Sequence, residues 1–194
     1  MRTSSENTRG LVLLDRDGVI NQDSASFIKT PDEWQPIPGS LDAIARLSDA
    51  GYQVVVMSNQ SGVGRGLFSI YKLHAIHRKM LAAIREVGGQ LAGIAFCAHA
   101  PKDFCLCRKP RSGLIIQLLE RMPEPILLSI GDSPRDLLAA RGFTERLMLV
   151  RTGKGQAAEA RCQALIPEVR VYADLAAAVE AFFNEHEASH EVTG

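Results

Sequence analysis

The chain has 194 residues, 46% of them hydrophobic, and its 22 basic and 22 acidic residues cancel to a formal net charge of zero. Such a chain can bury one sizeable core, and the lack of a net positive charge argues against nucleic acid as a partner. The first ten residues lack the hydrophobic segment of a secretory signal, and no hydrophobic run is long enough to cross a membrane. We therefore expect a soluble, cytoplasmic protein with no membrane partner, and by default a monomer.

Short segments rich in strand-forming residues alternate with helical patterns along the chain. The predicted strands cover residues 11–14, 52–58, 94–97, 126–130, 147–150 and 169–172. Helices are expected between Ser40, which would cap the first of them, and Gly51, and at 69–87, 113–121, 136–141 and 175–183. Alternation of this kind gives right-handed crossovers, so the predicted fold class is α/β, with a doubly wound, mostly parallel sheet.

The predicted organisation is a single domain over residues 1–190, with its motifs between 11 and 155 and a polar, flexible tail at 184–194. A helix, a strand and a cysteine-rich loop occupy the chain between Ser58 and Lys109. No stretch is left there for a separate cap domain. The site is therefore expected to be open to small soluble substrates at the carboxyl ends of the strands.

Asp15 and Asp17 follow directly after the apolar segment at 11–14. Buried carboxylates are costly unless they are paired, hydrogen-bonded or bound to a metal, so two of them at the end of a buried strand indicate a ligand crevice. An Asp-x-Asp pair also occurs in solvated turns, but here further polar motifs accompany it. We interpret the pair as part of an anionic, metal-assisted site.

Other predicted strands also end in polar residues. Phosphoryl transfer requires a nucleophile, a hard cation held by carboxylates, and donors or cations that neutralise the transferred group. The carboxylates of Asp15 and Asp132 suit Mg²⁺ rather than zinc. The other parts are also present at predicted strand ends or before a helix, as Ser58, Asn59, Gln60, Ser61, Arg108, Lys109 and Ser133.

Three of the four cysteines crowd around a histidine at 97–107. Cys97, His99, Cys105 and Cys107 could fill the tetrahedral shell of a zinc ion and leave no open position for water, which is typical of a structural site. This loop ends next to Arg108 and Lys109, so a bound zinc would hold both cations over the site. Cys162 stands apart and is interpreted as an ordinary thiol.

These motifs, in this order, resemble those of the haloacid dehalogenase (HAD) superfamily of phosphatases, which use an aspartate nucleophile. The resemblance covers about residues 11–155 and is carried by Asp-x-Asp-Gly at 15–18, Ser58, Lys109 and Gly-Asp at 131–132. It implies a Rossmann-like fold and a phosphatase that forms an aspartyl-phosphate intermediate.

Within the superfamily, the segments at 15–21, 58–62, 108–110 and 150–155 resemble the D-glycero-D-manno-heptose-1,7-bisphosphate 7-phosphatases. That resemblance implies a small sugar bisphosphate as substrate, on the route to the ADP- or GDP-heptose of lipopolysaccharide cores. The similar histidinol-phosphate phosphatases share the zinc-loop pattern and Arg-Lys-Pro. They, or another small sugar-phosphate phosphatase, are the alternative.

The resemblance implies a role for each matching residue. Asp15 would be the nucleophile, and Asp17 the general acid and base, which requires it to stay partly protonated near neutral pH. Ser58 would donate to a phosphoryl oxygen, and Lys109 would neutralise the phosphoryl group. Mg²⁺ would be held by the side chains of Asp15 and Asp132 and by the backbone carbonyl of Asp17.

Substrate contacts are expected beside these groups. Arg108 would bind the second phosphate with its planar fork. Arg65 lies between two glycines that let the backbone approach an anion closely. The sugar hydroxyls are assigned to Asp23, Ser24, Ala25, Ser26, Asn59, Gln60 and Ser61.

Some alternatives remain open. Asp136 could orient Lys109, or it could simply favour the first turn of a helix. A phospho-accepting receiver domain in signalling would share the fold and a phosphorylated aspartate, but it would contain no zinc cluster. A zinc-stabilised binding module without catalysis would have no need of the complete catalytic set.

Overall fold

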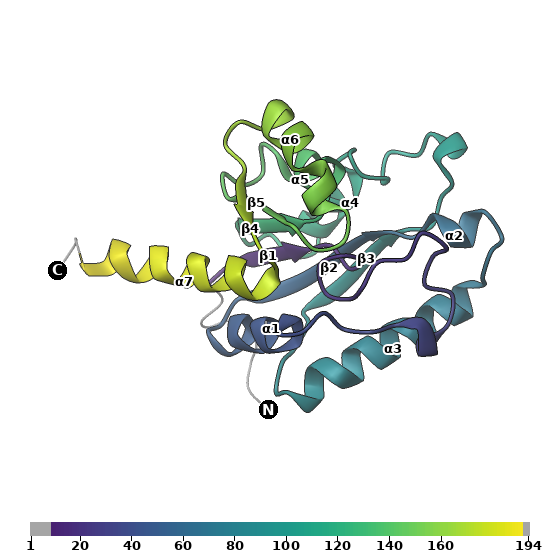
Figure 1. Cartoon of the computed structure of the whole chain (residues 1–194), viewed down its shortest axis with the longest axis horizontal. Coiled ribbons are helices and arrows are strands. Elements are labelled where there is room, and N and C mark those ends of the chain that lie inside the picture. Colours follow the sequence, from purple (N-terminus) through teal and green to yellow (C-terminus); the bar gives the residue numbers. More distant parts are fainter. Residues whose placement is uncertain (1–8, 192–194) are drawn as a thin grey trace.

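The computed structural model of the chain describes residues 9–191. One six-stranded sheet has the order β3-β2-β1-β4-β5-β6, and all its neighbouring strands are parallel (Figure 1). The strands are β1 (Leu11–Leu14), β2 (Gln53–Asn59), β3 (Gly93–Cys97), β4 (Ile126–Gly131), β5 (Leu147–Val150) and β6 (Arg170–Tyr172).

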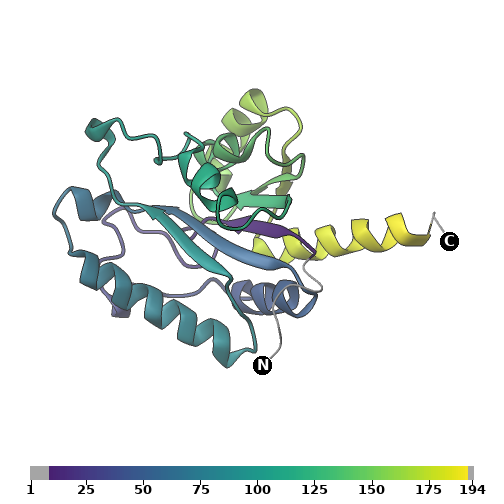
Figure 2. The ribbon, with the colours of Figure 1, turned by 180° about the vertical axis from the view of Figure 1, so that it is seen from behind.

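Helices cover both faces of the sheet, as Figure 2 shows from behind. One face carries α1 (Ser40–Asp49), α3 (Ile70–Glu86) and α7 (Leu175–Glu191), and the other carries α4 (Gly113–Leu119), α5 (Pro134–Ala140) and α6 (Gly155–Leu165). The short helices α2 (Ser61–Gly64), η1 (Pro31–Glu33) and η2 (Pro101–Asp103) lie in the connections. The predicted doubly wound α/β fold is confirmed.

The central strand β1 is apolar throughout because it faces a core on each side. Val12 and Leu14 pack into the core under α1, α3 and α7, whereas Leu11 and Leu13 pack into the core under α4, α5 and α6. All four side chains are buried, and each contributes on the order of 1.5–3 kcal/mol. This burial fixes the strand whose end carries Asp15.

The strand order creates a crevice beside β1. From β1 the chain moves outward through β2 to β3, and it then returns to place β4 on the other side of β1. The connections on the two sides therefore leave in opposite directions, and ligands bind outside the carboxyl ends at such a switch point. Those ends, with α2 directly after β2, lie to the right in Figure 1.

Three details differ from the sequence-based predictions. Ser40 does not cap α1 but begins it, because its hydroxyl donates to the Ile20 carbonyl while Gly39, at φ 77°, occupies the cap position. Helix α7 continues to Glu191 rather than ending near 183, and residues 192–194 of the predicted tail lie outside the described part. Helices α2 and α6 were not predicted.

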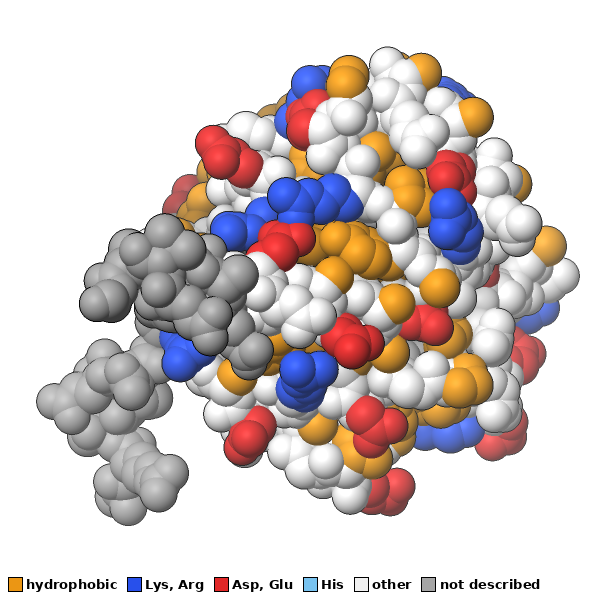
Figure 3. All heavy atoms as spheres, turned by 60° about the vertical axis from the view of Figure 1, so that its left-hand side comes forward, with side chains coloured by type: hydrophobic (Ala, Val, Ile, Leu, Met, Phe, Trp, Pro, Cys, Tyr) orange, Lys and Arg blue, Asp and Glu red, His pale blue; other side chains and the backbone are white. Residues whose placement is uncertain are grey.

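Charged side chains of both signs are interspersed on the face drawn in Figure 3. This agrees with the formal net charge of zero. Over the described residues, none of the helices has the length and apolar character required to span a membrane.

His77 of α3 is a buried histidine whose ring contacts Phe96 at a centroid distance of 5.6 Å. Its Nε2 has no hydrogen-bond partner among the described residues. Burial, together with the positive charge of Arg16, lowers the pKa of His77 to about 4. The folded protein therefore holds this imidazole neutral.

This burial predicts a loss of stability in mild acid. Unfolded His77 has a pKa near 6.5, so below that pH this residue binds more protons in the unfolded state, and its contribution to stability falls until the pH reaches about 4. Between pH 7 and pH 5 the loss from His77 is about 2 kcal/mol. Urea unfolding at both pH values should show that His77→Met loses about 2 kcal/mol less than the wild type. His74→Met, at an exposed position of α3, is the control and should behave like the wild type; equal losses in all three would contradict the prediction.

Candidate active site

Asp15 lies at the end of β1 and contacts a buried lysine. The Lys109 ammonium lies 2.9 Å from Asp15 Oδ1 and 2.7 Å from Asp136 Oδ1, and it donates to the Met57 carbonyl at 2.6 Å. Burial raises the pKa of Asp15 to about 7, a shift that Lys109 opposes and that the nearby carboxylates of Asp136 and Asp132 increase. Burial lowers the pKa of Lys109, but its two carboxylate partners outweigh burial and keep the ammonium charged.

Asp136 combines the two roles that the sequence left open. One carboxylate oxygen pairs with Lys109, and the other accepts from the backbone N–H and the hydroxyl of Ser133, at 3.1 and 2.6 Å, in the first turn of α5. Burial raises the pKa of Asp136, but the charge of Lys109 lowers it further, and the net shift is downward. Asp136 therefore orients Lys109 and also caps the helix.

Three carboxylates can hold a cation here. Oxygens of Asp15, Asp132 and Asp136 all lie within 4.8 Å of one another. Because both Asp136 oxygens already have partners, Asp15 and Asp132 are better placed as ligands. Burial and the neighbouring charge of Asp136 raise the pKa of Asp132 to about 6, a repulsion that a divalent cation would offset. Carboxylate oxygens fit Mg²⁺ in donor chemistry.

Two glycines make room for the Asp132 carboxylate. Gly18 and Gly153 have φ angles of 83° and 60°, and a Cβ on either would lie 2.2–2.3 Å from Asp132 Oδ2. That oxygen accepts the backbone N–H of Lys154 at 2.8 Å. The close approach and the positive φ angles together require glycine at both positions.

Asp17 is held by three buried side chains. Arg16 donates to both of its oxygens at 2.7–2.9 Å, and Asn21 and Gln60 each donate at 3.0 Å. Burial raises the pKa of Asp17, but Arg16 and the amide hydrogen bonds outweigh it and hold the pKa below its ordinary value. The expectation of a partly protonated Asp17 is therefore wrong for the protein without substrate. The sequence pattern did not indicate that Arg16 turns inward and stabilises the ionised carboxylate.

The polar residues at the end of β2 and directly after it mostly contact protein groups. Asn59, expected to bind the sugar, instead holds the Lys109 backbone, donating to its carbonyl and accepting from its N–H at 3.1 Å each. Gln60 Nε2 donates to Ser58 Oγ at 2.6 Å as well as to Asp17. These two amides therefore organise the site from within.

An open cavity of about 270 Å³ lies over these groups. Most of the predicted site residues line it, but Ser26 and Lys109 do not, and Lys109 contacts the lining residues Asp15 and Asp136. Lys154, which the matching segment at 150–155 could have indicated, forms an ion pair with Asp23 across the cavity. The residues that line the cavity are Asp15, Asp17, Asp23, Ser24, Ala25, Phe27, Ile28, Ser58, Asn59, Gln60, Ser61, Arg65, Arg108, Asp132, Ser133, Arg135, Asp136 and Lys154.

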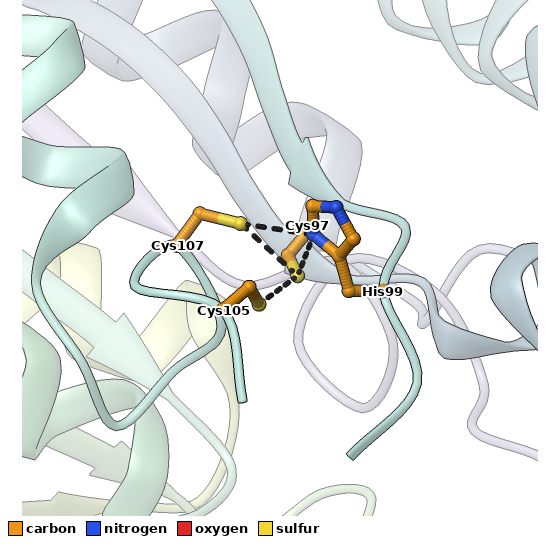
Figure 4. Close-up of side chains that lie close together, drawn as sticks. All are labelled: Cys97, His99, Cys105 and Cys107. Atoms are coloured by element: carbon orange, nitrogen blue, oxygen red, sulfur yellow. Dashed lines mark hydrogen bonds between the residues drawn. The ribbon is translucent and has the colours of Figure 1, made fainter. Parts of the chain in front are cut away.

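The predicted cysteine–histidine cluster is brought together after β3. Cys97 Sγ lies 3.6 Å from Cys105 Sγ, 3.4 Å from Cys107 Sγ and 3.6 Å from His99 Nδ1, and the four side chains point toward one another (Figure 4). A tetrahedral zinc ion with bonds of about 2.3 Å to sulfur would separate its ligands by about 3.7 Å. The four side chains therefore fit a closed zinc shell.

Comparison with known proteins places this site in a family. The family described as polynucleotide kinase 3 phosphatase matches residues 12–132, and a HAD-hydrolase-like family matches residues 106–178. The crystal structure of a D,D-heptose 1,7-bisphosphate phosphatase from Bordetella bronchiseptica, complexed with magnesium and phosphate, is 46% identical, with a TM-score of 0.86 over 91% of this chain and 99% of that chain. The chain is a HAD-like phosphatase.

Relatives of known activity show which group of HAD-like phosphatases the chain belongs to. D-glycero-beta-D-manno-heptose-1,7-bisphosphate 7-phosphatases from Bordetella bronchiseptica and Pseudomonas aeruginosa are each 47% identical, over 90% and 76% of this chain and 98% and 84% of theirs. The chain belongs to the family of these heptose bisphosphate phosphatases. This membership decides against a signalling receiver domain.

Because the buried Lys109 ammonium pairs with both Asp15 and Asp136, we expect Asp136 to stabilise the folded protein. Asp136→Asn leaves the buried ammonium with one carboxylate partner fewer, and breaking a buried ion pair costs about 3–5 kcal/mol. We expect the free energy of unfolding in urea to fall by about 3 kcal/mol. Glu168→Gln breaks an exposed pair with Arg141 and should cost under about 1 kcal/mol. Similar costs for the two variants would contradict the assignment.

Proposed function

We propose that this chain removes the 7-phosphate of D-glycero-β-D-manno-heptose 1,7-bisphosphate, with Mg²⁺ as cofactor, in the supply of activated heptose for lipopolysaccharide. The observation that carries the proposal is the arrangement of Asp15 and Asp132 in the lining of an open cavity, with the Lys109 ammonium paired to Asp15, in a chain whose relatives are heptose bisphosphate phosphatases. A cytoplasmic location and a monomeric state remain predictions.

In the proposed reaction, Asp15 attacks the phosphorus of the 7-phosphate, and the bond from phosphorus to the sugar oxygen breaks. Asp17 gives a proton to that departing oxygen and later takes one from the water that cleaves the aspartyl-phosphate. Lys109 and Ser58 neutralise and bind the phosphoryl oxygens. Mg²⁺ would be held by Asp15, Asp132 and the Asp17 carbonyl, and it would supply positive charge that offsets the repulsion between the carboxylate and the phosphate. The products are heptose 1-phosphate and phosphate.

Substrate binding can explain how Asp17 comes to carry the proton that it must donate. The ionised form is favoured in the described state because Arg16 lies against the carboxylate. An incoming phosphate dianion brings negative charge next to Asp17 and thereby raises its proton affinity. Substrate binding itself would then load the general acid.

The second phosphate is assigned to the cations on the cavity rim. Arg108 and Arg65 both line the cavity, and Arg108 Nη1 also donates to the His99 carbonyl at 3.4 Å. Arg108 is therefore tied to the cysteine-rich loop. Asp23, Ser24 and Ala25 line the cavity and would face the sugar.

Phosphate release tests the proposal. With Mg²⁺, the wild type should hydrolyse the β anomer of heptose 1,7-bisphosphate faster than the α anomer and much faster than histidinol phosphate. Asp15→Asn should abolish release while the circular dichroism spectrum stays unchanged. A preference for histidinol phosphate would move the chain to the alternative, and turnover by Asp15→Asn would refute the nucleophile.

We further propose that the cluster of Cys97, His99, Cys105 and Cys107 binds a structural zinc ion. Elemental analysis of the purified protein should then give one zinc per chain. Cys105→Ser should lose it and raise KM more than it lowers kcat, since the Arg108 loop is released. Cys162→Ser, at a buried thiol outside the cluster, is the matched control and should keep its zinc. Full zinc content in Cys105→Ser would contradict the site.

A further inference from the structure

Arg16 is a fully buried arginine next to the proposed nucleophile, and it takes no part in the proposed reaction steps. Its Nε donates to Asp17 Oδ1 at 2.9 Å, and its Nη2 donates to Oδ1 and Oδ2 at 2.7 and 2.8 Å. Among the described residues, Asp17 is its ion-pair partner. The guanidinium is thus aimed at the proposed general acid.

Packing does not account for a charged group at this position. Desolvating a guanidinium costs several kcal/mol, and hydrophobic side chains of similar volume often replace buried ion pairs without loss of stability. Arg16 Nη1 is itself buried with no hydrogen-bond partner in the described part of the chain. Arg16 thus has one nitrogen without a partner, while its other two side-chain nitrogens bind Asp17. A cost of this kind indicates that the residue is present for function rather than for stability.

The Asp17 carboxylate lies at the wall of the cavity, with 22% of its side chain exposed. Arg16 binds it from the buried side, and Gln60 links it to Ser58 Oγ through one amide nitrogen. The proposed general acid and the proposed phosphate-binding hydroxyl therefore belong to one hydrogen-bonded chain. A restraint on the Asp17 carboxylate therefore also restrains its distance from the Ser58 hydroxyl.

We propose that Arg16 is a positioning residue, which holds the Asp17 carboxylate where the departing sugar oxygen meets it. The inference rests on the proposed function in that Asp17 is taken as the proton donor. A general acid acts only within hydrogen-bond reach of its target, so a carboxylate free to rotate donates less often. Without Arg16, Asp17 keeps its hydrogen bonds from Asn21 and Gln60 but loses the guanidinium contacts to both of its oxygens, which limit rotation of the carboxylate.

The leaving group provides the test. A sugar alkoxide needs a proton as it departs, whereas p-nitrophenolate leaves without one. In Arg16→Met, kcat/KM, which reports the formation of the aspartyl-phosphate, should fall about 100-fold for heptose 1,7-bisphosphate, the scale of general acid catalysis, and less than about threefold for p-nitrophenyl phosphate. Arg16→Lys keeps the charge without the fork and should give an intermediate loss on the sugar phosphate. Equal losses on both substrates would overturn the proposal.

A double variant distinguishes the positioning of Asp17 from a general disturbance of the site. In Asp17→Asn, the further change Arg16→Met should add no loss on the sugar phosphate, because its target is already gone. Additive losses would overturn the inference. If Arg16→Met fails to fold, Arg16→Lys decides by the same two substrates. If the wild type cleaves p-nitrophenyl phosphate and another alkyl phosphate but not the heptose bisphosphate, the proposed function fails, and that alkyl phosphate still tests Arg16.

Discussion

The buried ammonium of Lys109, held between Asp15 and Asp136, is the contact on which the rest of the site depends. Three segments far apart in the sequence meet there: the end of β1, the loop before α4 and the first turn of α5. A lone ammonium would be too costly to bury, and two adjacent carboxylates would repel each other. Together they stabilise one another, and the excess negative charge that remains when both carboxylates are ionised suits a site that binds a divalent cation.

Backbone contacts keep that unit in place. Asn59 at the end of β2 binds both the N–H and the carbonyl of Lys109, and the preceding cysteine-rich loop begins at the end of the neighbouring strand β3. The loop is therefore anchored to the sheet at both ends. A metal in the cysteine cluster would act on catalysis only through this anchoring, since its four ligands leave it no open position.

The sequence predicted the central strands of the sheet well because they are buried on both faces. The apolar segments at 11–14 and 147–150 match β1 and β5 in full, since every residue in them packs against a core. Helix α6 was missed because only Gly155 and Cys162 are buried within it and its alanines form no apolar stripe. Ser40 was misassigned because a serine hydroxyl can serve a distant carbonyl, here that of Ile20, as readily as a helix end.

The sequence could group the candidate site residues for the same topological reason, but it could not give the direction of their side chains. Residues at the carboxyl ends of parallel strands meet at one edge of the sheet, so Asp15, Ser58 and Asp132 could be grouped from the sequence. Whether an amide faces the substrate or a neighbouring backbone depends on rotamers that spacing does not encode. Asn59 and Arg16 both turned toward protein partners. The groups that position the proposed catalytic residues are thus harder to predict than those residues themselves, because their partners are set only once the chain has folded.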